Sequence, residues 1–261
     1  MDTSNNNRSV FRRGIILKEG EEMIQPHILC EKVSERVLLP GDPKRVDRVA
    51  KFLENVKEVA FNREFKTIIG EYKGKKITVT STGIGGTSAA IALEELIACG
   101  GSVFIRIGSA GAIQNNIDIG DLIISTGSIR EDGASAMYVE KSFPAVAHPE
   151  VLRAMEDQAI KLDYKYHIGL TRSHDSFYVD DEMERMKLWH NRGVLGSDME
   201  TSALFVIGHL RNVRVGAVLN NVVVYEADVK DGINNYVDSE SLAAQGEEKE
   251  IILALESLIS L

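Results

Sequence analysis

The sequence predicts a single-domain α/β protein with three layers, in which helices cover both faces of a central twisted sheet that is mixed but mostly parallel. Two observations carry this prediction. Segments with strand character alternate along the chain with segments whose apolar residues recur at helical spacing. In addition, the segment 103–107 is an apolar run broken only by Arg106, as expected for a buried strand. A length of 261 residues suits one such unit with one large core.

The alternation runs from residue 35 to the end of the chain. Expected strands lie at 37–39, 76–82, 103–107, 122–125, 168–171 and 215–224. Expected helices begin at Asp42-Pro43 or cover 88–98, 149–162, 199–210 and 247–258. Because ligands of such folds bind beyond the carboxyl ends of the strands, the residues that follow each strand are the first candidates for a site.

Residues 1–22 are expected to be a flexible extension ahead of a domain at 23–261. This stretch is polar and charged and lacks the apolar core of a signal peptide. No apolar run in the chain reaches the roughly 20 residues that a membrane span needs. We therefore expect a cytoplasmic protein. Cys30 and Cys99 are expected to be buried free thiols, since two cysteines make no disulfide framework.

The net charge of −9 argues against a broad basic surface for nucleic acid. A small anionic ligand is still compatible with it, provided that a few arginines and backbone amides converge on that ligand. No histidine–cysteine spacing indicates zinc, and no Gly-x-Ser-x-Gly elbow is present. We expect neither a metal site nor an organic cofactor.

The segment P-G-D-P-K-R at 40–45 is the first candidate site. A strand ends at Gly41 and a helix begins at once, so a backbone amide and a helix N-terminus are available to an anion. Arg45 lies in the first helical turn, where a cation opposes the helix dipole unless an anion is bound nearby. The alternative is a simple turn with a solvated arginine.

Arg106 is the second candidate, because it lies inside an apolar strand near its carboxyl end. A buried guanidinium without an anionic partner is costly, so either a carboxylate or a ligand phosphate must pair with it. We favour the ligand, since Gly108 and Gly111 leave room for one against the backbone.

Two further segments are open to more than one interpretation. The glycine-rich run at 81–88 resembles a dinucleotide fingerprint, but Ser88 occupies the third glycine position, so an NAD site is disfavoured against a tight packing turn. Asp198 and Glu200 fall at the start of an apolar helix, where acidic residues are common. Glu200, next to a buried stripe, is also suited to accept hydrogen bonds from two ribose hydroxyls.

Taken together, the motifs resemble those of the hexameric nucleoside phosphorylase family, which includes uridine phosphorylase and bacterial-type purine nucleoside phosphorylases. The resemblance covers about residues 25–261. It rests on P-G-D-P-K-R at 40–45, N-R-E-F at 62–65, T-G-I-G-G at 82–86, R-I-G-S-A-G at 106–111, F-P-A-V at 143–146, D-S-F-Y at 175–178 and D-M-E-T-S at 198–202. Each motif is weak alone, and the set in this order is specific.

The resemblance implies roles for individual residues. Phosphate would be bound by Gly41, Arg45, Arg106, Ser109 and, from a neighbouring subunit, Arg63. Ribose would be bound by Met199, Glu200 and a neighbour's His27, and the base by Phe177, Ala110, Gly111 and Asn221. Arg106, Glu200 and Asn221 would be the catalytic residues. Inorganic phosphate would be the co-substrate, and the expected assembly is a homohexamer built from dimers with shared sites.

The base-reading residues depart from the family pattern. Purine enzymes usually have an aspartate and uridine enzymes an arginine where this chain has Asn221. The glutamine and arginine that read uracil are replaced at the ungapped positions by Asp181 and Met183, and Arg185 fits only if the loop shifts. From S-T-G-I-G-G and R-E-D-G-A-S we favour uridine over purine nucleosides as substrate. A hydrolytic nucleosidase and a non-catalytic nucleoside-binding protein remain alternatives.

Overall fold

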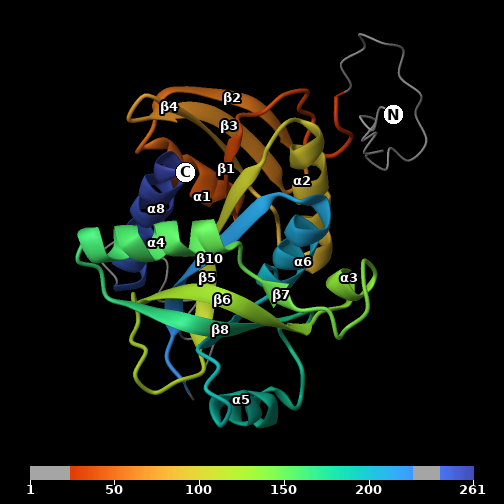
Figure 1. The fold of residues 1–261 in the computed structure, drawn as a ribbon, viewed down its shortest axis with the longest axis vertical. Helices are drawn as coiled ribbons and strands as arrows, with labels where there is room; N and C mark the ends of the chain where they lie inside the picture. The colour runs from red at the N-terminus through yellow and green to blue at the C-terminus, as the bar shows by residue number, and fades with distance from the viewer. Residues whose placement is uncertain (1–23, 226–241) are drawn as a thin grey trace, which may run out of the picture.

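The computed structural model describes residues 24–225 and 242–261 (Figure 1). The extension expected at 1–22 lies outside the described residues. The strands are β1 (Arg36–Pro40), β2 (Glu54–Asn62), β3 (Phe65–Tyr72), β4 (Lys75–Thr80), β5 (Val103–Ala112), β6 (Leu122–Glu131), β7 (Ala145–Val146), β8 (Tyr166–His174), β9 (Gly196–Asp198) and β10 (Arg214–Val223). The helices are α1 (Pro43–Ala50), α2 (Gly86–Ala98), α3 (Gly133–Ala136), α4 (Pro149–Lys161), α5 (Glu182–His190), α6 (Thr201–Arg211) and α8 (Leu242–Ser260).

All ten strands belong to one mixed sheet, which confirms the predicted α/β class. Parallel pairs occupy the middle, where β1 lies between β4 and β5, and β5 also pairs with β10. Antiparallel pairs join β2, β3 and β4 at one end. The other end closes on itself, because β5, β9, β8, β6 and β10 pair in a ring. This barrel-like closure was not predicted from the sequence.

The apolar core lies on both faces of the sheet, as the alternation along the central strands requires. In β1, Val37 and Leu39 point to the face covered by α2 and α6, whereas Leu38 points to the face covered by α1, α4 and α8. Leu38 pairs in register with Ile105 of β5, which lies on the same face. Figure 1 shows α4 and α8 on one side of the strands and α2 and α6 on the other.

Local sequence signals place several boundaries. Asp42 caps α1 by accepting a hydrogen bond from the Lys44 amide at 2.9 Å, and Pro43 is the first helical residue, as predicted. The helix expected from 199 begins instead at Thr201, because residues 196–198 form the short strand β9. The sequence analysis assigned no structure to β2, β3 or α5. Strand β2 is mostly exposed and therefore lacks a clear apolar period.

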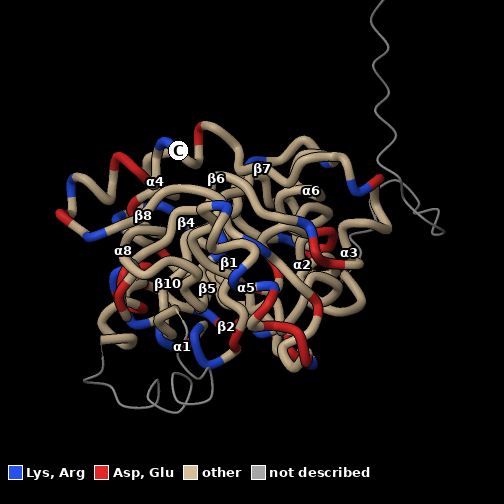
Figure 2. The backbone as a smooth tube through the Cα atoms, turned by 90° about the horizontal axis from the view of Figure 1, so that it is seen from below, with Lys and Arg blue, Asp and Glu red and all other residues tan. Residues whose placement is uncertain are grey.

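Charged residues of both signs are interspersed over the chain, and no extended basic face stands out in Figure 2. Among the described residues, no helix is both long enough and apolar enough to cross a membrane.

Gly216 of β10 shows how closely α4 packs on the sheet. A Cβ atom at this position would lie 2.5 Å from Cγ1 of Val151 and 2.9 Å from Cε of Met155. We expect Gly216→Ala to lower the free energy of unfolding by about 1–3 kcal/mol, the usual cost of overpacking a core. Denaturant unfolding measures this change. Adding Val151→Ala should recover part of the loss, and additive losses in the double variant would contradict the proposed clash.

Candidate active site

The turn after β1 and the loop 82–86 lie against each other at the carboxyl ends of the parallel strands. The amide of Thr82 donates to the Pro40 carbonyl at 2.9 Å, and the amide of Gly83 donates to the Gly41 carbonyl at 3.0 Å. Gly83 has a φ of +70°, and a Cβ there would lie 2.6 Å from Cγ of Glu64. Only glycine fits this backbone without strain. The run at 81–88 is therefore a tight turn beside Gly41, as the packing interpretation predicted.

Arg106 is buried in β5 and bound by two carboxylates. Its Nε donates to Asp198 Oδ2 at 2.9 Å, and its Nη2 donates to Glu200 Oε2. The other oxygen of Glu200, Oε1, accepts from the Gly85 amide at 2.5 Å, so this carboxylate joins β5, the loop 82–86 and the start of α6. The carboxylate partner that the sequence analysis considered as the alternative to a ligand is thus present. Nη1 of Arg106 is buried and has no hydrogen-bond partner among the described residues.

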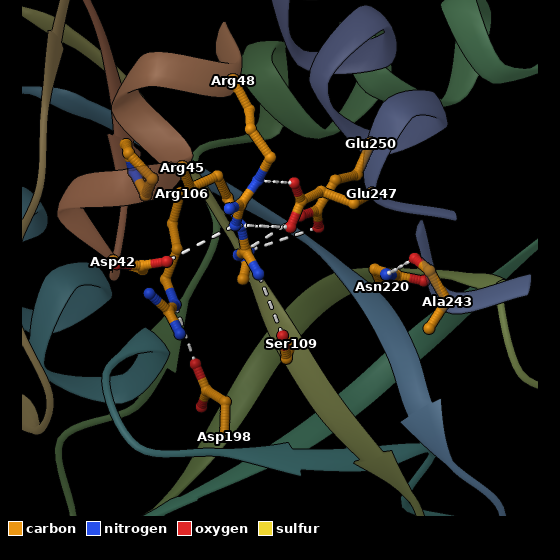
Figure 3. A network of polar contacts seen from close by, with 12 residues as sticks. Asp42, Arg45, Arg48, Arg106, Ser109, Asp198, Asn220, Ala243, Glu247 and Glu250 are labelled. Carbon is orange, nitrogen blue, oxygen red and sulfur yellow. Dashed lines mark hydrogen bonds and ion pairs between the residues drawn. The ribbon is translucent and has the colours of Figure 1, made fainter. Parts of the chain in front are cut away.

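Arg45 is the second buried arginine of the site, and it is paired from the opposite side of the sheet. Its Nε donates to Glu247 Oε2 at 2.9 Å, and its Nη1 lies 3.4 Å from Glu250 Oε1. Its Nη2 donates to the hydroxyl of Ser109 at 3.0 Å. The structure therefore brings together two of the residues predicted to bind phosphate, Arg45 and Ser109 (Figure 3).

The carboxylates around the two arginines have shifted pKa values. In Figure 3 their side chains lie next to each other, with Asp198 on one side and the α8 carboxylates on the other. Burial raises the pKa of Glu200, and the nearby Arg106 works against that rise. Burial also raises the pKa of Glu250 to about 8, although Arg45 opposes the shift. Glu250 is therefore a buried acid that takes up a proton near neutral pH.

Arg63 and His27 lie at the β2–β3 hairpin. Arg63 is exposed and occupies the tight turn with a φ of +54°. Nδ1 of His27 lies 2.6 Å from the carboxylate oxygen Oε1 of Glu95, and the carbonyl of His27 accepts a hydrogen bond from Asn62. Glu64, the residue after Arg63, accepts from the Ser88 hydroxyl at 2.8 Å, next to the loop 82–86. Through Glu64, this hairpin contacts the loop 82–86.

The predicted ribose and base residues occupy different environments. Met199 is half-buried between β9 and α6, next to Glu200. Ala110 and Gly111 continue β5 beyond Arg106, and Ala110 pairs in register with Asn221 of β10. Phe177 is 40% exposed and meets Tyr178 edge to face at 5.2 Å between ring centroids.

Asn221 is fully buried, and its amide nitrogen is already engaged. Nδ2 donates to the carbonyl of Asp118 at 3.1 Å and lies 3.5 Å from that of Ile117. Its Oδ1 has no hydrogen-bond partner among the described residues. What Asn221 offers to a ligand in this arrangement is an acceptor.

Sequence reasoning missed Arg48, Glu247 and Glu250. Arg48 donates to both oxygens of Glu247, and the amide of Gly108 donates to Glu250 Oε2 at 3.3 Å. A signal was present, because the two glutamates lie three residues apart and therefore on one face of the expected helix 247–258. Carboxylates in a buried stripe need partners, just as the buried arginine does.

The family of the chain follows from comparison with known proteins. The sequence model of the family described as the phosphorylase superfamily matches residues 35–244. The chain belongs to the phosphorylase superfamily. This confirms the resemblance read from the motifs, and the match includes Arg45, Arg106, Asp198 and Glu200 but ends before Glu247 and Glu250 of α8.

Individual members of the superfamily match over most of this chain. It is 43% identical to a uridine phosphorylase of Thermococcus kodakarensis over 214 residues, which are 77% of each chain. It is 38% identical to a guanosine phosphorylase of Halorubrum lacusprofundi, with 74% of this chain and 81% of the other covered. The crystal structure of a uridine phosphorylase from Vibrio fischeri superimposes with a TM-score of 0.85 at 43% identity, covering 91% of this chain and 98% of that one.

The raised pKa of Glu250 makes a prediction about stability and pH. Because the folded state holds the Glu250 proton up to about pH 8 while the unfolded value is 4.5, this group favours the folded state less and less as pH rises from 4.5 to 8. We expect Glu250→Gln to remove this dependence. The free energy of unfolding of the variant should fall less steeply over that range than that of the wild type, as measured by urea titrations at several pH values.

The exposed Glu248 on the same helix provides the control, and Glu248→Gln should leave the wild-type slope unchanged. Parallel pH profiles of wild type and Glu250→Gln would show that Glu250 is ionised throughout.

Proposed function

We propose that this protein is a nucleoside phosphorylase that cleaves the glycosidic bond of a nucleoside with inorganic phosphate, with uridine as the favoured substrate. The products are the free base and ribose 1-phosphate, which makes the enzyme a pentosyltransferase of nucleoside salvage or catabolism. Phosphate is the co-substrate, and the reaction needs no organic cofactor. Membership of the superfamily and the names of its relatives support this proposal.

The observation that carries the proposal is the state of Arg106. Two of its nitrogens are fixed by Asp198 and Glu200, while the buried Nη1 retains an unused N–H group. A buried donor without a partner is costly unless a ligand completes it. Beside it are the hydroxyl of Ser109 and the guanidinium of Arg45. This is a fixed set of donors suited to a tetrahedral oxyanion.

The chemistry follows from this set. Cleavage of the glycosidic bond builds positive charge on the sugar in an oxocarbenium-like transition state. A phosphate bound by Arg45 and Arg106 under the sugar stabilises that charge and then attacks the anomeric carbon. The carboxylates that pair with both arginines fix their orientation before phosphate arrives, so little reorganisation is needed during the reaction. Glu200 has further lone pairs with which to accept the ribose hydroxyls.

For the base, we propose that Phe177 packs on its face and that Asn221 contributes through Oδ1, next to Ala110 and Gly111. An acceptor at this point suits the N–H groups of uracil or of a 6-oxopurine. The guanosine phosphorylase among the relatives is the specific reason to keep purine nucleosides as the second candidate. Phosphate-independent cleavage by a nucleosidase would leave the convergence of Arg45 and Arg106 without a purpose.

We further propose that a second copy of the chain completes each site. Arg63 and His27 lie at the β2–β3 hairpin, where the large apolar side chain of Phe61 is exposed, as is that of Ile84 in the loop 82–86. Apolar side chains around an exposed cation and an imidazole favour coverage by another subunit. A dimer formed there would place Arg63 and His27 over the neighbour's phosphate and ribose, and a hexamer assembles from three such dimers.

The deciding experiment is a cleavage assay with uridine, thymidine, inosine, guanosine and adenosine, each with and without phosphate. We expect base release that requires phosphate, with uridine turned over fastest. Release without phosphate would instead indicate hydrolysis, and no release from any substrate would indicate a non-catalytic binding protein.

Arg106→Lys tests the role of the guanidinium. Lysine retains the positive charge that Asp198 and Glu200 require, so the variant should fold, but it loses the planar fork with its spare N–H. We expect kcat/KM to fall by about 100-fold or more, the usual effect of losing one fixed donor to a transition state. Steady-state phosphorolysis measures the change, and circular dichroism checks the fold. A variant with wild-type kinetics would remove Arg106 from the phosphate site.

A complementation experiment tests the shared site. Arg63→Ala and Arg106→Lys should each be inactive alone. In a mixed dimer, one site combines an intact Arg106 with the partner's intact Arg63, so co-expression should restore about a quarter of wild-type activity after random pairing. Differently tagged chains allow the mixed species to be purified. If mixed species stay as inactive as either parent, Arg63 acts within its own subunit or has no role in catalysis.

A further inference from the structure

Arg172 is a second arginine buried within a strand, and the proposed mechanism makes no use of it. It lies on β8, two residues before the strand ends, and its side chain is 1% exposed. Arg172 is also the largest fully buried side chain of the described residues. A buried cation needs anionic partners, so the partners of Arg172 indicate its role in the structure.

Both partners of Arg172 are carboxylates, and they come from different elements. Nε donates to Glu131 Oε2 at 2.6 Å, at the end of β6. Nη1 and Nη2 donate to the two oxygens of Glu182 at 2.6 and 3.2 Å, at the start of α5. Burial works to lower the pKa of Arg172, but these two carboxylates raise it. All three nitrogens of Arg172 thus donate to carboxylates, and unlike Nη1 of Arg106 none of them is left without a partner.

The Arg172–Glu182 ion pair fixes one end of the loop 175–181. Strand β8 ends at His174 and α5 begins at Glu182, so the connection 175–181 is pinned at its far end by Glu182. Its near end is pinned as well, because Asp175 Oδ2 accepts from the Gly133 amide at 2.6 Å. Phe177 lies between these two points and remains 40% exposed.

This loop starts at the site. Ser173, one residue after Arg172, donates through its hydroxyl to Asp198 Oδ1 at 2.6 Å, and Asp198 is the partner of Arg106. Ser173 and Arg172 point to opposite faces of β8, as neighbours in a strand do. Through Ser173, β8 therefore contacts Asp198, the partner of Arg106. Through Arg172, it holds the loop that carries Phe177.

We propose that Arg172 is a positioning residue for the nucleoside: by binding Glu182 and Glu131 it holds the loop 175–181 and its Phe177 in place on the base side of the site. This inference rests on the proposed function. Asp181 and Met183 occupy the positions expected for base-reading residues, and neither is the standard residue there. The structure pairs Asp181 with Arg185 at the surface and gives Glu182 to Arg172.

We call Arg172 with Glu131 and Glu182 the clamp. Its physical effect is to order the loop 175–181 before the nucleoside binds. A loop pinned at one end samples many more conformations than one pinned at both, and binding must then offset the cost of ordering it. Loss of the clamp therefore weakens binding of the nucleoside. Phosphate binding should be spared, because Arg45 and Arg106 lie on α1 and β5 and contact neither Glu131 nor Glu182 in the described structure.

The test compares the two Michaelis constants of Arg172→Met. We expect the KM for nucleoside to rise by about tenfold or more, with the KM for phosphate changed by less than about twofold. Because removal of a buried cation can impair folding, Glu182→Gln is the second variant. It keeps the size of the side chain and leaves Arg172 paired with Glu131, and it should shift the same constant in the same direction by less.

Arg211→Met is the matched control. Arg211 forms a comparable two-pronged pair with Glu94, but that pair is exposed at the end of α6. This variant should leave both Michaelis constants as in the wild type. Arg172→Lys should have a lower KM for nucleoside than Arg172→Met. The lysine ammonium still attracts both carboxylates, although it cannot form the two parallel hydrogen bonds of a guanidinium.

Trp189 reports on the clamp independently of turnover. It is the sole tryptophan of the chain, and its Nε1 donates to Glu131 Oε1 at 3.1 Å. We expect its fluorescence emission to move to longer wavelength in Arg172→Met, because the half-buried indole gains contact with water when Glu131 loses its partner.

The outcomes separate this inference from the proposed function. Equal changes in both Michaelis constants, or an unchanged KM for nucleoside in a folded variant, would overturn the positioning role. If the wild type phosphorolyses no nucleoside, the proposed function fails. The positioning role can still be tested by binding: Trp189 emission measures the binding constant of uridine for the wild type and for Arg172→Met. No difference between those binding constants would overturn it.

Discussion

The buried guanidinium of Arg106 sets the constraint on which the site depends. A strand in the middle of an α/β sheet is normally apolar, and a cation there must have anions brought to it. Asp198 and Glu200 supply them, which explains why the chain inserts the short strand β9 before α6 begins at Thr201. The same constraint reaches Gly108, where a Cβ would lie 2.6 Å from Nη2 of Arg106.

A second set of pairs mirrors the first on the other side of the sheet. Arg45 at the start of α1 is held by Glu247 and Glu250 of α8, while its Nη2 reaches Ser109 of β5. Each arginine is thus fixed in place by carboxylates, and Nη1 of Arg106 has no hydrogen-bond partner among the described residues. This explains how a chain with a net charge of −9 is suited to a small anion. The local geometry of a few hydrogen-bond donors determines whether the site suits an anion, and the net charge of the chain does not.

The sequence was informative where one residue type had one physical use. Asp42-Pro43 marked the start of α1, and Arg106 in an apolar run marked the site. It was uninformative where residues from distant parts of the chain meet. The partners of Arg45 lie about 200 residues later, and the exposed strand β2 has no period to read. Arg172 directly follows the expected strand 168–171, and its partner Glu182 lies between Asp181 and Met183, the positions at which base-reading residues were sought.

The ring formed by β5, β9, β8, β6 and β10 also bears on how the protein forms during synthesis. Arg106 is separated from Asp198 by 92 residues, and Arg45 is separated from Glu247 by 202. A growing chain therefore exposes both arginines long before their carboxylates have been made, and contacts of such long range form slowly. Until α8 leaves the ribosome, Arg45 cannot be buried with its charge compensated by Glu247. A chain that stops before its last 20 residues would retain most of the sheet but would lack the helix that holds Arg45.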